Sequence, residues 1–78
     1  MELTLKAARV NAGYKQEEAA GLLDISVSSL SNYERGISYP DIPVIKRIET
    51  LYGVSYDQLI FLPKDYGKTV RKNGEAAV

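Results

Sequence analysis

Apolar residues recur at helical spacing from the start of the chain. Leu5, Ala8 and Ala12 stand three and four residues apart, which places them on one side of a helix with 3.6 residues per turn. Thr4 can cap the N-terminus of this helix, and Gly13 can end it. The pattern therefore predicts a first helix over about residues 4–12, with its apolar side turned inward.

Two short helices joined by a tight turn are predicted next, within residues 16–36. The first covers about residues 16–23, with Glu17 and Glu18 suited to the helix dipole in its first turn. The second begins after Ser26, whose hydroxyl can accept a hydrogen bond from a first-turn N–H. Leu30 and Tyr33 fall on one side of this helix, and polar side chains fall on the other: Ser28, Ser31, Asn32 and Arg35.

A fourth helix is predicted over about residues 42–52. Asp41 is its expected cap, Gly53 its expected end, and an inward stripe is formed by Ile45, Ile48 and Tyr52. Lys46 and Arg47 are read as solvated charges on its surface, with phosphate contact as the alternative.

The sequence Ser55-Tyr56-Asp57-Gln58 is a capping box and predicts the start of a fifth helix. Leu59 is expected to close the core. The apolar run at residues 60–62 exceeds what a last helical turn can bury, so it predicts a surface that meets a partner; alternatively, Phe61 and Leu62 fold back onto the first helix.

Composition changes at Pro63. Residues 1–62 are expected to form one domain, and residues 63–78 a C-terminal tail that is partly flexible. Lys68, Arg71 and Lys72 in this tail can extend the reach of positive charge, or the segment around them can pair as a strand across a dimer.

A chain of 78 residues without cysteine or histidine limits the possible chemistry. The usual zinc sites, thiol nucleophiles and Ser-His or Cys-His arrangements are excluded, so no metal or cofactor is expected. Glu17 and Glu18 point about 100° apart on a helix and do not form a catalytic pair. We expect a protein that is not an enzyme, with no evident small-molecule ligand. There is no membrane-spanning run and no signal-peptide pattern, which favours a cytoplasmic location.

The charge balance does not by itself indicate a polyanionic partner. The chain holds ten basic and ten acidic residues; residues 1–62 hold six and eight, and residues 63–78 hold four and two. A small DNA-binding protein can still function with its cations on one face, because phosphate contacts are local. Modest nonspecific affinity is expected.

Residues 16–36 resemble the helix-turn-helix of phage repressors and Cro proteins, the XRE type. The family pattern Q-x-x-L-A-x-x-x-G-V-S-x-x-x-I-S-x-x-E-x-G is met in register by eight residues: Gln16, Ala20, Ile25, Ser26, Leu30, Ser31, Glu34 and Gly36. The resemblance implies an all-α fold, a compact five-helix bundle like the DNA-binding domain of lambda repressor. Ala19 departs from the usual leucine, which thins the core unless Leu22 or Leu23 fills it. Asp24 replaces the usual glycine of the turn and tolerates a left-handed backbone less well.

The resemblance also assigns roles near the two helices. In the family, an arginine matching Arg9 forms a salt bridge with a glutamate matching Glu34; the alternative for Arg9 is a phosphate contact. Gln16 matches the family's phosphate clamp, and an amide beside free N–H groups at a helix N-terminus suits an anion; the alternative is an ordinary exposed polar residue.

Base contacts are expected from Val27, Ser28 and Asn32. Asn can form two hydrogen bonds with adenine, Ser can hydrogen-bond to either base of a pair, and a Val methyl can pack on the thymine methyl. The alternative is a merely solvated face. Phosphate contacts are expected from a second set, in which Tyr33 is alternatively part of the core: Lys15, Gln16, Ser26, Ser31, Tyr33, Arg35 and Tyr39.

In the family the fifth-helix region often forms a two-fold dimer contact, here Tyr56, Ile60, Phe61 and Leu62. These expectations describe a sequence-specific DNA-binding transcriptional regulator, a homodimeric repressor that binds double-stranded DNA at a palindromic operator through the major groove. The alternative keeps the fold but makes protein the main partner, as in an antitoxin or an antagonist of another repressor.

Overall fold

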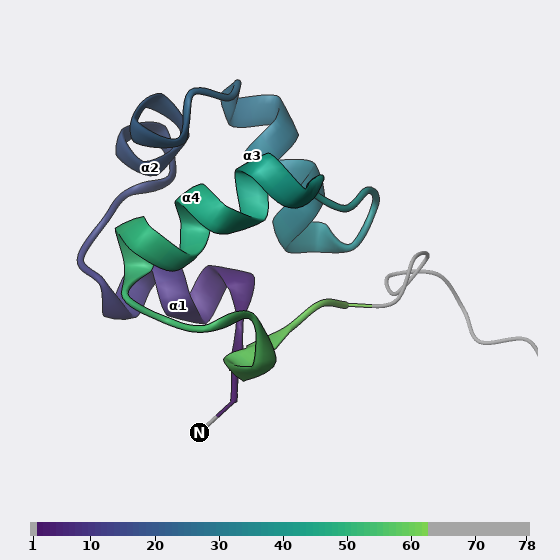
Figure 1. Ribbon diagram of the computed structural model, residues 1–78. Helices are drawn as coiled ribbons and strands as arrows, with labels where there is room; N and C mark the ends of the chain where they lie inside the picture. Colours follow the sequence, from purple (N-terminus) through teal and green to yellow (C-terminus); the bar gives the residue numbers. More distant parts are fainter. Residues whose placement is uncertain (1, 63–78) are drawn as a thin grey trace, which may run out of the picture.

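Four α-helices make up most of the chain that the computed structural model describes, residues 2–62 (Figure 1). The elements follow in the order β1 (Leu3–Thr4), α1 (Leu5–Asn11), α2 (Gln16–Leu23), α3 (Val27–Arg35), α4 (Ile42–Tyr52), the 3₁₀ turn η1 (Tyr56–Gln58) and β2 (Leu59–Ile60). The predicted tail, residues 63–78, lies outside the described residues. None of the helices in residues 2–62 has the length and apolar character needed to cross a bilayer.

The core lies where all four helices meet. Its largest fully buried side chains are Leu23, Leu30 and Ile48, contributed by α2, α3 and α4. Ala19 is also completely buried, and Leu23 supplies the bulk that the alanine lacks. Leu22 points outward with 60% of its surface exposed. Of the two leucines considered for filling the space, Leu23 is therefore the one that does so.

Three of the four α-helices begin with the side-chain caps that the sequence predicts. The oxygen of Thr4 accepts from the backbone N–H of Ala7 at 3.1 Å, and that of Ser26 from Ser29 at 3.0 Å. The Asp41 carboxylate accepts from the N–H of Val44 at 3.2 Å. Each bond pairs a first-turn donor that the helix itself leaves free.

Helix α2 begins differently, because a lysine side chain cannot accept a hydrogen bond. Here the backbone N–H of Lys15 donates to the carboxylate of Glu18 at 2.8 Å. This is one half of a capping box, and it places a negative charge at the positive end of the helix dipole.

The turn between α2 and α3 passes through a left-handed residue. Asp24 has φ 61° and ψ 42°, and it is the only non-glycine residue with positive φ in residues 2–62. The expectation of a left-handed backbone at this position is confirmed. Aspartate populates this region more readily than most residues, although less readily than glycine, so the turn keeps a small strain.

The inward stripe of α4 differs from the prediction by one residue. Val44, Ile48 and Tyr52 are buried, whereas Ile45 is half-buried. The spacing of four residues along the buried row gives a nearly straight line on the helix surface, and α4 contacts both α2 and α1. Periodicity alone left the choice between adjacent apolar residues undetermined.

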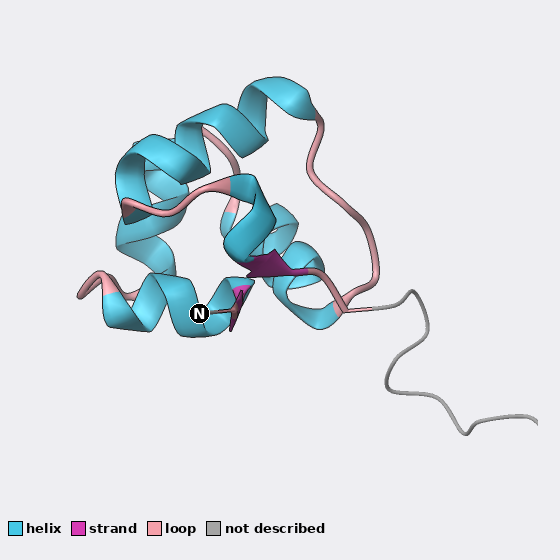
Figure 2. Cartoon of the chain, turned by 60° about the horizontal axis from the view of Figure 1, so that its bottom comes forward, coloured by secondary structure: helices cyan, strands magenta, loops and turns pink. Residues whose placement is uncertain are grey.

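The predicted fifth α-helix is replaced by a single 3₁₀ turn followed by a short strand. The N–H of Ser55 does donate to Oε1 of Gln58 at 2.9 Å, so the capping interaction forms. The chain then extends, and β2 pairs in parallel with β1, Leu3 beside Leu59 (Figure 2). Pro63 disfavours helical backbone at the residue before it, and burial of Leu59 favours the extended path. The fold is mostly helical, with four α-helices and a two-residue strand pair.

Gly21 offers a simple test of helix propensity in α2. An added Cβ at this position meets no atom within 4 Å, and the backbone is ordinary helix. Gly21→Ala is expected to stabilise the fold by about 0.5–1 kcal/mol, because alanine loses less conformational freedom on folding. Urea unfolding measures the change; a loss of stability would show that the site is more crowded than the structure indicates. Gly53, with φ 69°, is the control, since alanine there is expected to destabilise.

Candidate nucleic-acid interface

The outward face of α3 is open to solvent. Leu30 is fully buried and Tyr33 is half-buried against the core, which fixes the rotation of the helix. Opposite them, Ser28 and Arg35 are exposed and Asn32 is half-exposed. Within residues 2–62 the side chains of these three polar residues form no hydrogen bond. Their donors and acceptors are therefore available to another molecule.

A buried ion pair connects α1 to the end of α3. The Nε of Arg9 donates to Oε2 of Glu34 at 2.7 Å, and its second terminal nitrogen to Oε1 at 3.2 Å. The remaining terminal nitrogen donates to the Tyr14 carbonyl at 2.9 Å. The two charged side chains are only 9% and 4% exposed. The pair is bidentate and desolvated, an arrangement in which each charge depends on the other.

Gln16, the first residue of α2, belongs to the same network. Its Nε2 donates to Oε1 of Glu34 at 3.1 Å. The sequence spacing does not indicate this contact, because the two residues are 18 positions apart along the chain. The first backbone N–H group of α2 with a carbonyl partner is that of Ala19, so the preceding N–H groups of Gln16 and Glu17 have no hydrogen-bond acceptor among residues 2–62.

Tyr52 of α4 is buried beside this network. Its hydroxyl makes no hydrogen bond in the described part of the chain. Burial, and then the negative charge of Glu34, raise the pKa of Tyr52 to about 12. The phenol therefore stays neutral, and its raised pKa means that stability falls as the pH rises above the ordinary value of 10.

Charges around α3 and the start of α2 are mixed. Lys15 and Arg35 are exposed cations, while Glu17 and Glu18 are exposed acids on the first turn of α2. An approaching phosphate would thus meet both signs. Affinity from charge alone would be small, as the overall balance of the domain also suggests.

The loop after α3 meets the C-terminal end of the described chain. The hydroxyl of Tyr39 donates to the carbonyl of Leu62 at 2.7 Å, and its ring packs edge-on against Phe61. Phe61 also lies beside the ring of Tyr56, at 5.8 Å between centroids. With the neighbouring Ile60, 40% exposed, these residues form a surface that we call the aromatic patch: Tyr39, Tyr56, Ile60 and Phe61. Tyr39, predicted to contact phosphate, thus already has a partner for its hydroxyl.

Both sequence-based alternatives for the apolar run apply in part. Phe61 is half-buried against the core, and β2 contacts α1. Tyr56, at 52% exposure, and Ile60 remain accessible. The chain folds back as far as Phe61 and still leaves apolar surface open to a partner.

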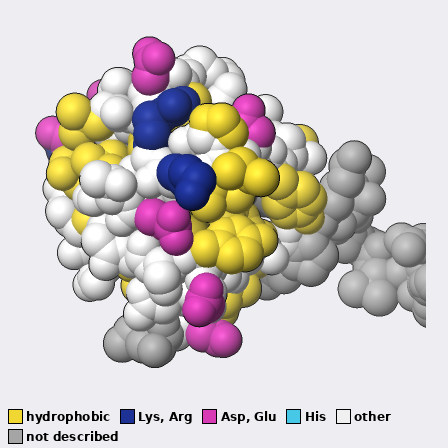
Figure 3. Space-filling view, viewed as in Figure 1, with side chains coloured by type: hydrophobic (Ala, Val, Ile, Leu, Met, Phe, Trp, Pro, Cys, Tyr) yellow, Lys and Arg dark blue, Asp and Glu magenta, His cyan; other side chains and the backbone are white. Residues whose placement is uncertain are grey.

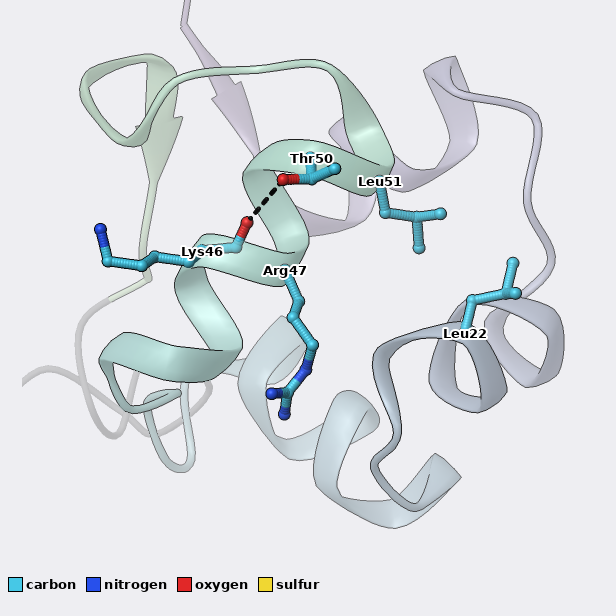
Figure 4. Close-up of a pocket in the computed structure, with 5 residues that line it drawn as sticks. All are labelled: Leu22, Lys46, Arg47, Thr50 and Leu51. Atoms are coloured by element: carbon cyan, nitrogen blue, oxygen red, sulfur yellow. Dashed lines mark hydrogen bonds between the residues drawn. The ribbon is translucent and has the colours of Figure 1, made fainter.

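A shallow groove of about 380 Å³ lies between α2 and α4, lined by Leu22, Lys46, Arg47, Thr50 and Leu51 (Figure 4). Arg47 has a structural task there: its Nε donates to the Leu23 carbonyl at 2.9 Å and caps the C-terminus of α2. It is therefore more than the solvated charge that the sequence suggested. Figure 3 shows basic side chains beside hydrophobic ones on this side of the molecule.

Among the described residues, no cluster of acidic side chains is arranged to hold a metal ion.

The short α2, the left-handed turn and the solvent-facing α3 together define a helix-turn-helix. A family model described as helix-turn-helix matches residues 5–59. The chain belongs to the XRE-type helix-turn-helix family.

Two curated relatives from Bacillus subtilis (strain 168) are similar to this chain. The HTH-type transcriptional regulator ImmR is 48% identical over 56 residues, which cover 72% of this chain and 44% of ImmR. The SPbeta prophage-derived uncharacterized HTH-type transcriptional regulator YonR is 34% identical over 56 residues, 72% of this chain and 52% of YonR. The chain spans about half the length of these relatives.

Proposed function

We propose that this protein is a DNA-binding transcriptional regulator that inserts α3 into the major groove. The observation that carries the proposal is the outward polar face of α3, held in place by the buried Leu30 and free of bonds within the described residues. The two relatives, both named as transcriptional regulators, support it. A helix placed this way can present short side chains to base edges.

Base reading is assigned to three residues within the first six positions of α3: Val27, Ser28 and Asn32. Val27 is 42% exposed and Ser28 is exposed, one turn before Asn32. Asn32 can donate to and accept from one adenine, while Val27 can pack on a thymine methyl. The phosphate contacts are assigned to residues around this face: Lys15, Gln16, Ser26, Ser31, Tyr33 and Arg35.

Self-association is assigned to the aromatic patch together with Leu62. Its tyrosine and isoleucine side chains are accessible and apolar, and aromatic residues are enriched in such contacts. A two-fold dimer would present two copies of α3 about 34 Å apart, one turn of DNA, to the halves of a palindromic operator. Occupying promoter DNA in this way makes the regulator a repressor.

Selection of bound sequences from random DNA, using the full chain, tests the proposal. We expect an enriched palindrome with half-sites one helical turn apart, and binding that weakens steeply with salt. An asymmetric single site would reject the dimer and keep the DNA-binding role. No retention of DNA at low salt would reject the proposal and favour the alternative of a protein partner, which the accessible aromatic patch also suits.

Asn32→Ala tests the base-reading role. We expect a loss of about 1–3 kcal/mol on the selected operator, with relaxed preference at one base pair and little change on random DNA. Gln16→Ala is the contrast: it should weaken binding to both DNAs by a similar factor. Titrations with both DNAs measure the difference, and equal losses for Asn32→Ala on operator and random DNA would remove this residue from base reading.

A further inference from the structure

We infer that Glu34, held in place by Arg9, is a positioning residue that fixes the Gln16 amide for a phosphate contact. This inference rests on the proposed DNA-binding function and adds to it. In addition to any effect on stability, the ion pair would then orient the Gln16 amide at the edge of the candidate interface.

The hydrogen-bond pattern at Glu34 supports this role. Its carboxylate accepts three bonds, two from Arg9 and one from Gln16. Because the side chain is only 4% exposed, water does not compete effectively for these positions. An ionised carboxylate is only an acceptor, so the amide group of Gln16 must turn its nitrogen toward Glu34. The ion pair thereby selects one of the two amide orientations.

The chemistry of the amide then determines what remains free. A glutamine nitrogen carries two hydrogens in one plane, about 120° apart. One is used by Glu34, so the direction of the other is fixed relative to α2. The free backbone N–H groups of Gln16 and Glu17 lie at the same helix end. A phosphate oxygen would therefore find several donors already oriented, without the entropic cost of ordering a flexible side chain.

Glu34 also connects the phosphate contact to base reading. It lies on α3, directly before the exposed Arg35, which is the last residue of the helix. The bond between Glu34 and Gln16 joins the start of α2 to the end of α3. The spacing between a phosphate contact and the base-reading residues is thereby set by a bond within the protein.

The first test needs no DNA. Relaxation of the Gln16 side-chain amide, measured by NMR on the free wild-type chain, should show an order parameter above about 0.6, the value below which groups count as flexible. In the paired exchange Arg9→Met with Glu34→Met, which removes both buried charges, this value should fall. Gln58, the other glutamine, makes no contact with the pair and should not change. A mobile Gln16 amide in the wild type would overturn the inference.

The second test is a double-mutant cycle on DNA affinity at temperatures where every variant is folded. The paired exchange should weaken operator binding about three- to tenfold when Gln16 is present, the range expected for ordering one flexible side chain. In a Gln16→Ala background it should have no further effect. Equal losses in both backgrounds would show a purely structural pair and overturn the inference, as would no loss in either. If the wild type binds no DNA while its Gln16 amide is ordered, the proposed function fails instead, and the positioning role fails with it.

Discussion

Arg9→Met alone is expected to lower the free energy of unfolding by about 3–5 kcal/mol, the typical cost of leaving one member of a buried pair without its partner. Glu34 would stay buried, at 4% exposure, with only the Gln16 amide as donor. The Tyr14 carbonyl would lose its bond as well. For a domain of this size, whose stability lies near the lower end of about 5–15 kcal/mol, such a loss would remove most of the free energy that keeps the chain folded. Urea unfolding followed by circular dichroism measures the change.

Two further variants make this prediction specific. Arg35→Met removes an exposed arginine from the end of α3 and should cost less than about 1 kcal/mol. Adding Glu34→Met to Arg9→Met should recover most of the lost stability, because a buried ion pair replaced by apolar residues of similar volume is often neutral. If the single and paired exchanges proved equally harmful, the loss would come from packing and not from an uncompensated charge.

Leu23→Ala is expected to cost about 2–5 kcal/mol, since it opens a cavity in the centre of the core. Leu23 is completely buried, and it fills the space beside the small Ala19. Thermal unfolding of the purified variant measures the loss.

The adjacent leucine is a matched control. Leu22 is also a leucine and lies in the same helix, yet 60% of its surface is exposed. Leu22→Ala should change stability by less than about 0.5 kcal/mol. Comparable losses at the two positions would mean that α2 is rotated about its axis relative to the structure described here.

The helices with strong local signals were predictable from the sequence. The bounds of α2 and α4 agree with the pattern of caps, glycine ends and apolar spacing. Ser26 and Gly36 likewise delimit α3, because each has a chemical reason to stand at its end of a helix. Such features act over three or four residues and can be read without the rest of the fold.

Features that depend on distant residues were harder to predict. The Ser55 capping box indicates a helix start, but pairing with Leu3 and burial of Leu59 extend the chain after one turn. The bond from Gln16 to Glu34 and that from Tyr39 to Leu62 likewise join separate elements. No local sequence pattern predicts these contacts, because they form only when the helices have packed.

The strand pair has a consequence for the order of folding. Leu3 beside Leu59 closes a loop that contains all four helices, whereas many other contacts join elements that are neighbours in sequence. Closing so long a loop is entropically costly until the helices have shortened the distance between its ends. The two strands should therefore come together late, and their amides should be the first of the hydrogen-bonded backbone amides in the domain to exchange with deuterium.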